Sequence, residues 1–222
     1  LAFAVSSGLK THPERFDLTI IPKFSLFILF KTAMIAILAG LVGIVFCFSL
    51  TYGKKYAKKI IENDYLRIAI GGAVIVIITV IVGNQTYNGA GVSFIESIFE
   101  NETVINEAFI LKMLLTVIAV SVGFKGGEIV PTLFIGAAFG SAAAALFGLP
   151  VAFGAAIGMT ALFCSVTNCP LAAIFLSLEM FSFKGAGYFA LAAILSFFVS
   201  GKIGLYSAQQ RITFKKGVKN EN

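Results

Sequence analysis

The stretch GFKGGEIVP, residues 123–131, lies between two apolar segments and contains three glycines, one acid and a proline. Glycine permits tight backbone turns, and proline fits the first turn of a helix, where its missing N–H has no intrahelical acceptor. The amides of Ile129 and Val130 would then point out of a helix end that carries about half a positive charge. The stretch therefore predicts a helix N-terminus suited to an anion, or alternatively a glycine loop that only joins two packed helices.

The composition around this stretch is that of a membrane protein. Of the 222 residues, 58% are hydrophobic and 13% are charged, and the mean hydropathy is +0.94. Soluble domains have roughly 45–50% apolar and about 25% charged residues. This excess of apolar surface disfavours a soluble enzyme, a disordered chain and a disulfide-bonded secreted domain. We therefore expect an integral, multi-pass protein of the lipid bilayer.

The apolar segments on both sides of the stretch predict an all-α fold of helices of unequal length. They cover residues 24–52, 65–82, 92–99, 108–122, 129–146, 152–166, 171–181, 187–200 and 203–214. A span needs about 20 apolar residues, so the first segment is long enough to tilt, and several of the about nine helices are too short to cross. Short helices end inside the membrane only where the irregular backbone is buried in protein or lines a cavity.

Basic residues lie beside apolar segments, at residues 54–59 and 211–219, and account for the formal charge of +6. The positive-inside rule places such flanks on the cytoplasmic side, so the charge does not indicate a nucleic-acid partner. Lys112, near one end of an apolar segment, is expected to reach the bilayer surface with its ammonium group.

Few side chains are suited to catalysis. The only histidine, His12, lies in a polar loop near the start, and Cys47, Cys164 and Cys169 lie in or beside apolar stretches, where we expect them to pack. An intramembrane enzyme needs a nucleophile–base pair or a metal cluster, so we predict no enzyme, no metal and no cofactor. A non-catalytic membrane scaffold is a further alternative, although a scaffold has little use for short helices that meet at a Gly-Gly-Glu turn.

Four ordered motifs resemble the second, C-terminal half of the CLC family of chloride channels and anion/proton exchangers. The first is GGEIVP at residues 126–131, a glycine pair followed by two amide donors and a proline. The others are AAIGMTALFCSVTNCP at 155–170, LAAIFLSLEM at 171–180 and GKIGLYS at 201–207. The resemblance extends over about residues 24–215.

The resemblance implies a CLC-type bundle of tilted, partly non-spanning helices, the second half of an inverted repeat. Residues 1–222 would form one transmembrane domain without a cytoplasmic regulatory domain, in a bacterial cell membrane. The implied anion-binding residues are Gly126, Gly127, Ile129, Val130 and Tyr206, the last through its hydroxyl group. The implied function is movement of halide, chloride first, with anion/proton exchange or a fluoride/proton antiporter as alternatives.

The resemblance also implies a homodimer. One contacting segment would start at Leu171 and end at Met180, and the other would start at Gly187 and end at Ser200.

The departures from the family pattern concern the coupling group and the missing half. Glu128 follows the glycine pair, which is similar to the bacterial branch that includes fluoride/proton antiporters, and it is the candidate for proton or anion coupling. Alternatively, its charge only caps the helix. Fluoride members usually have threonine just before the proline, where this chain has Val130. The family's gating-glutamate loop does not occur in residues 1–222, so we expect half of an ion pathway and part of a longer protein.

Overall fold

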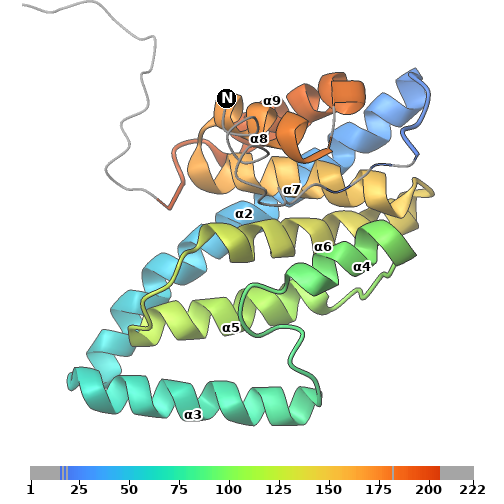
Figure 1. Cartoon of the computed structure of the whole chain (residues 1–222). Helices are drawn as coiled ribbons and strands as arrows, with labels where there is room; N and C mark the ends of the chain where they lie inside the picture. The colour runs from blue at the N-terminus through green and yellow to red at the C-terminus, as the bar shows by residue number, and fades with distance from the viewer. Residues whose placement is uncertain (1–15, 17, 19, 182, 206–222) are drawn as a thin grey trace, which may run out of the picture.

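The computed structural model describes residues 16, 18, 20–181 and 183–205, and the regular elements of this part of the chain are all helices, without strands. The elements are α2 (Leu26–Ile60), α3 (Asp64–Val82), α4 (Val92–Asn101), α5 (Ala108–Val122), α6 (Ile129–Phe147), α7 (Val151–Thr167), α8 (Pro170–Phe181), η1 (Phe183–Gly185) and α9 (Ala186–Ser200) (Figure 1). The expected all-α fold is confirmed, and α3 to α9 begin and end within two residues of the predicted segments.

The helices are stacked in order along the molecule. In Figure 1, α8 and α9 lie at one end, followed by α7, α6, α5 and finally α3, with α2 crossing behind the stack. Four elements are long and apolar enough to span a membrane, namely α2, α3, α6 and the η1–α9 unit, whereas α5, α7 and α8 are shorter. The prediction of both spanning and shorter helices is confirmed.

Helix α2 is longer than the apolar run that predicts it. Its 35 residues continue through the basic cluster at residues 54–59, so these lysines form its last two turns and do not follow the helix as a separate flank. At 1.5 Å per residue the helix is about 50 Å long, which exceeds the roughly 30 Å of a bilayer core. Lysines at this end also complement the negative end of the helix dipole.

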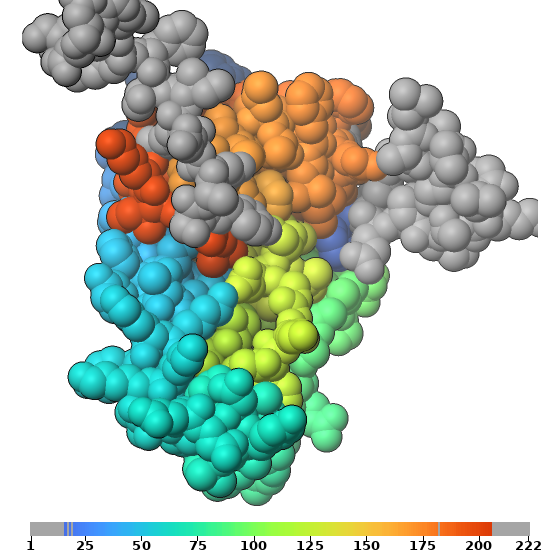
Figure 2. All heavy atoms as spheres, turned by 90° about the vertical axis from the view of Figure 1, so that its left-hand side faces the viewer, coloured from blue at the N-terminus to red at the C-terminus, as the bar shows by residue number. Residues whose placement is uncertain are grey.

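Helix α3 is anchored at its start and exposed over most of its length. The side chain of Asn63 caps the helix by accepting two hydrogen bonds from backbone amides of the first turn. Arg67 ties the helix to α5 through the carbonyl of Val122, at 3.2 Å, and pairs with Asp64 at 2.7 Å. Only 11% of the apolar window of α3 is buried, and Figure 2 shows it at the opposite end from the C-terminal helices.

The core lies between α6 and α7, where four glycines allow the two helices to touch. A Cβ on Gly140 would lie 2.2 Å from the carbonyl oxygen of Gly154, and one on Gly158 would lie 2.2 Å from that of Gly136. Two small residues separated by three others are a common contact pattern of membrane helices, because they let backbones approach closely. As a result, nearly every residue of α7 is buried, although this helix is one of the shorter ones.

Hydroxyl and thiol groups connect α7 to its neighbours. Thr160 and Ser177 of α8 share a hydrogen bond of 2.7 Å, and Ser165 donates to the carbonyl of Gly40 on α2 at 2.9 Å. Cys164 donates to the carbonyl of Ala193 on α9 at 3.1 Å. Such bonds satisfy polar groups that neither lipid nor apolar neighbours could satisfy.

Cys47 and Cys164 are buried, as expected for packing residues. Several sequence interpretations lie outside the described residues, namely those concerning His12, Tyr206 and the part of the 203–214 segment beyond Leu205.

Candidate anion site

The turn between α5 and α6 contains the candidate site. Helix α5 ends at Gly123, whose φ of 112° is open to glycine and strained in other residues. Among the described atoms, nothing lies within 4 Å of where a Cβ on Gly126 or Gly127 would stand. Helix α6 then begins at Ile129, with Pro131 in its first turn. The predicted turn and helix N-terminus are confirmed, and the space beside the glycine pair is open among the described atoms.

The first turn of α6 leaves its amide end free to bind a ligand. Ile129 and Val130 are its first two residues, so their N–H groups have no acceptor inside the helix. Thr132 is fully buried and donates from Oγ1 to the carbonyl of Glu128 at 2.7 Å, which orders the backbone just before the helix. Gly126, Gly127, Ile129 and Val130 thus lie together at one helix end, and their role in anion binding stays a prediction.

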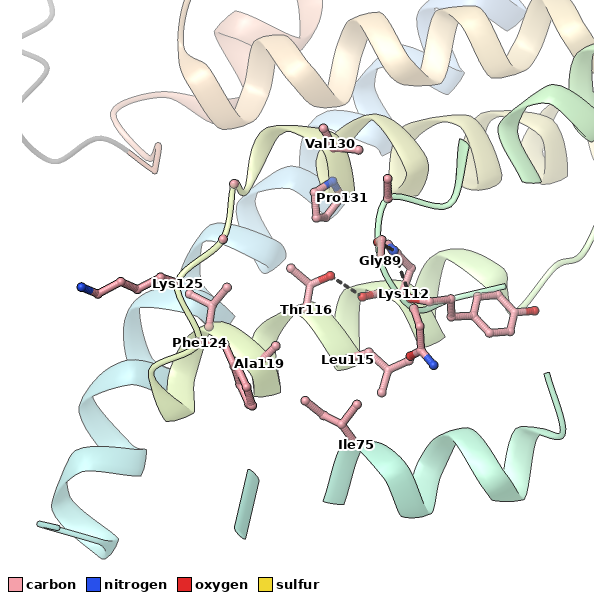
Figure 3. Close-up of a pocket in the computed structure, with 16 residues that line it drawn as sticks. Ile75, Gly89, Lys112, Leu115, Thr116, Ala119, Phe124, Lys125, Val130 and Pro131 are labelled. Atoms are coloured by element: carbon pink, nitrogen blue, oxygen red, sulfur yellow. Dashed lines mark hydrogen bonds between the residues drawn. The ribbon is translucent and has the colours of Figure 1, made fainter. Parts of the chain in front are cut away.

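A pocket of about 420 Å³ lies beside this helix end (Figure 3). Its walls come from α3, the loop before α4, α5 and the start of α6. They consist of Ile75, Tyr87, Asn88, Gly89, Ala90, Lys112, Leu115, Thr116, Ala119, Val120, Phe124, Lys125, Gly126, Gly127, Val130 and Pro131. Most of this surface is apolar, and electrostatic attraction by the amide end is stronger next to apolar walls than in open water.

Lys112 is buried inside the protein and does not extend outward from it, so the prediction made for it is wrong. Its side chain is 2% exposed and its Nζ donates to the carbonyls of Tyr87 at 3.0 Å and Gly89 at 2.6 Å (Figure 3). The ammonium group also lies 4.9 Å from the ring centroid of Phe134. The loop before α4 is not helical, so its carbonyls need donors, and the buried lysine supplies them.

Glu128 forms an ion pair with Lys54. Glu128 stands at the N-cap of α6, where its charge lies near the positive end of the helix, and its side chain makes no capping hydrogen bond. Instead, Oε1 lies 3.0 Å from Nζ of Lys54 in the last turns of α2. Sequence reasoning placed Lys54 in a basic flank and missed this contact, because 74 residues separate the two side chains.

The chain that leads to Tyr206 is held by Asn168, another residue that sequence reasoning missed. Asn168 ends α7 with a positive φ of 56°, and its side chain donates to the carbonyl of Ile203 at 2.7 Å. The amide of Leu205 donates to the carbonyl of Val166 at 2.9 Å. Ile203 and Leu205 pack on a cluster that includes Ile135 of α6. Asparagine is one of the few residues that tolerates positive φ, which is the only local signal for this role.

Known proteins resemble the chain over nearly its whole length. The family model described as voltage gated chloride channel matches residues 1–201. A chloride/fluoride channel protein of Pseudomonas syringae pv. tomato (strain ATCC BAA-871 / DC3000) is 34% identical over 180 residues, which is 78% of this chain and 40% of that protein. The crystal structure of a CLC-type fluoride/proton antiporter matches with a TM-score of 0.89 and 31% identity, over 94% of this chain and 53% of that one.

This chain therefore spans about half the length of these relatives, or less. The resemblance drawn from the four motifs is confirmed, as is the CLC-type arrangement of helices. Four helices long and apolar enough to cross agree with a multi-pass protein of the membrane, and the family consists of channels and transporters. The chain belongs to the voltage gated chloride channel family.

Proposed function

We propose that this chain supplies one half of a pathway that moves halide anions across a membrane. Chloride is the first candidate for the substrate, and the halide is exchanged for protons when transport is coupled. The observation that carries the proposal is the open amide end of α6 beside the 420 Å³ pocket. The relatives' names support it, since one is a chloride/fluoride channel protein and the other a fluoride/proton antiporter. Fluoride/proton antiport is the alternative, supported by the second name and by the acid at Glu128.

In this proposal the halide exchanges its hydration water for backbone donors. The amides of Ile129 and Val130 and the hydroxyl of Tyr206 bind it, and Gly126 and Gly127 let it approach the backbone. Partial charges at a helix end attract an anion without a full opposite charge, so the anion can also leave. An amide does not depend on its side chain, which is why valine at position 130 leaves this donor in place. The halide is substrate, and the mechanism uses no bond-breaking side chain, metal or cofactor.

Glu128 is the proposed coupling group. It immediately precedes the two amide donors, and an acid inside a membrane protein is costly unless it serves a function. When its carboxylate takes up a proton, one negative charge beside the halide disappears. Proton binding and halide binding then depend on each other through electrostatic repulsion. Glu128→Gln fixes the neutral form, so we expect slower proton-coupled flux. Halide and proton flux measured together check this, and unchanged coupled flux contradicts it.

A homodimer is also proposed, through α8 and α9. Both helices present large apolar side chains on the surface: Leu171 is 71% exposed, Phe175 67% and Phe198 73%. Two copies that pack these faces together would bury them. Cross-linking of single cysteines placed on α8 tests the contact, and a monomer in detergent and bilayer would rule it out.

The decisive experiment is flux from liposomes that hold the full-length protein. Efflux of radioactive chloride and of fluoride, the latter with a selective electrode, is recorded together with internal pH. We expect halide efflux accompanied by proton movement in the opposite direction. The ratio of the chloride efflux rate to the fluoride efflux rate decides whether chloride or fluoride is the substrate. If neither halide moves, the proposed function is wrong.

A further inference from the structure

The ion pair between Lys54 and Glu128 connects two distant parts of the chain. The ion pair of Arg67 with Asp64, by comparison, joins neighbouring turns of one helix. The Lys54–Glu128 pair instead joins the basic end of α2 to the residue before α6. The contact therefore fixes which way the Glu128 carboxylate points from the turn.

A close approach of α2 to α5 brings Lys54 within reach. A Cβ on Gly53 would lie 2.2 Å from Oγ of Ser121 and 3.3 Å from Cγ1 of Val117, so α2 and α5 approach each other closely at this glycine. Ser121 stands in the last turn of α5, just before the glycine turn. Lys54, the next residue of α2, consequently emerges beside the turn, where it meets Glu128.

The direction of the carboxylate matters because a halide and a carboxylate are attracted by the same helix end. An ionised side chain next to the first turn of a helix is stabilised by the free amides and the dipole. Yet Glu128 makes no bond to the amides of α6 and lies on Lys54 instead. We propose that Lys54 is a positioning residue, which holds the ionised carboxylate of Glu128 on the α2 side of the turn and leaves the amides of α6 to the halide.

The strength of the pair suits such a role. The side chain of Lys54 is 52% exposed and that of Glu128 is 21% exposed, so water screens the attraction. A pair of this kind shifts an equilibrium by up to about fivefold. A proton on Glu128 removes the attraction to Lys54, so the contact can break and re-form in every transport cycle. The inference rests on the proposed function of the α6 amide end.

The test measures how halide flux into liposomes depends on halide concentration, for the full-length protein and its variants. Lys54→Met frees the carboxylate to compete for the amides, so the apparent KM for halide should rise by up to about fivefold, with little change in maximal rate. Lys54→Arg keeps the charge and should restore the parent KM. Lys55→Met removes an exposed neighbouring charge of the same cluster and should leave the KM unchanged.

A double variant shows whether Lys54 acts through Glu128. In a Glu128→Gln background, Lys54→Met should add no further change in KM, because no carboxylate remains to be held. An unchanged KM in Lys54→Met, a lower maximal rate alone, an equal rise in Lys55→Met, or a rise that persists beside Glu128→Gln would each overturn the inference. Failure of the proposed function looks different, since the parent protein would then move no halide at all.

Discussion

Helices α3 and α6 are both 19 residues long and apolar enough to cross a membrane, yet their packing differs widely. In α6, 56% of the apolar window is buried, against 11% in α3. Helix α6 carries glycine and alanine on the face toward α7, whereas α3 is largely valine and isoleucine. Inside a bilayer, apolar side chains gain little by leaving lipid, so helix contact depends on small residues that let backbones approach.

This difference extends to the candidate site. The amide end that would bind the anion belongs to α6, the helix with the tight partner, and the pocket beside it is closed on the far side by Ile75 of α3 (Figure 3). A site is held in place only as firmly as the elements that carry it. Within the described residues, α6 is therefore the firmly packed support of the site, and α3 is the wall with fewer contacts.

Replacing Gly140 by alanine should give the largest loss. The added Cβ would lie 2.2 Å from the carbonyl oxygen of Gly154, which is backbone and cannot rotate away. Overpacking of this kind costs about 1–3 kcal/mol or more. We expect a strongly reduced melting temperature and yield of folded protein in detergent.

The matched control is Gly72→Ala in α3. A Cβ there would meet only Phe124, at 3.6 Å, and alanine is the better helix former by about 1 kcal/mol, so stability should be unchanged or higher. If Gly140→Ala and Gly72→Ala lost equal stability, α6 would not be packed more tightly than α3.

Lys112→Met should give a loss of intermediate size. The variant removes the donor to the carbonyls of Tyr87 and Gly89, at a site that is almost fully buried. Losing a charged donor to buried carbonyls costs about 1.5–3 kcal/mol, and thermal unfolding in detergent measures this loss. Lys125→Met is the control, because this lysine is exposed and should change stability by less than about 0.5 kcal/mol. If Lys112→Met lost as little stability as Lys125→Met, then Lys112 would not support the loop before α4.

Val80→Ala in α3 should have the smallest effect. Val80 is 73% exposed, so its truncation should alter the unfolding free energy by less than about 0.5 kcal/mol. Ile157→Val in the buried face of α7 should cost about 0.5–1.5 kcal/mol in the same assay. If the two variants lose equal stability, α3 is packed against another part of the assembled protein, and the contrast with α6 disappears.

Much of the fold could be predicted from local patterns in the sequence. The cap at Asn63, the glycines that end α3 and α5, and the proline that starts α8 are read within one or two turns of chain. The helix boundaries followed from these signals because each depends on hydrogen bonds between near neighbours. The extension of α2 was missed, since lysines end an apolar run without ending a helix.

The candidate site was predicted in its backbone and not in its side-chain contacts. The glycine turn and the start of α6 depend on a local run of residues, and the structure has them where the sequence predicts them. The partner of Glu128 lies 74 residues away, and the acceptors of Lys112 lie 25 and 23 residues away. No local pattern contains such pairs, because they form only when separate helices pack.

The sequence by itself thus determined that this is a helical membrane protein with a glycine turn and a helix N-terminus at residues 123–131. Apolar run lengths, caps and glycines suffice for that, since each acts within a few residues. Only the tertiary structure decided that Lys112 turns inward, that Lys54 holds Glu128, and that Asn168 fixes the chain before Tyr206. A charged or polar side chain takes the partners that packing brings to it, because a buried group without a partner is too costly to keep.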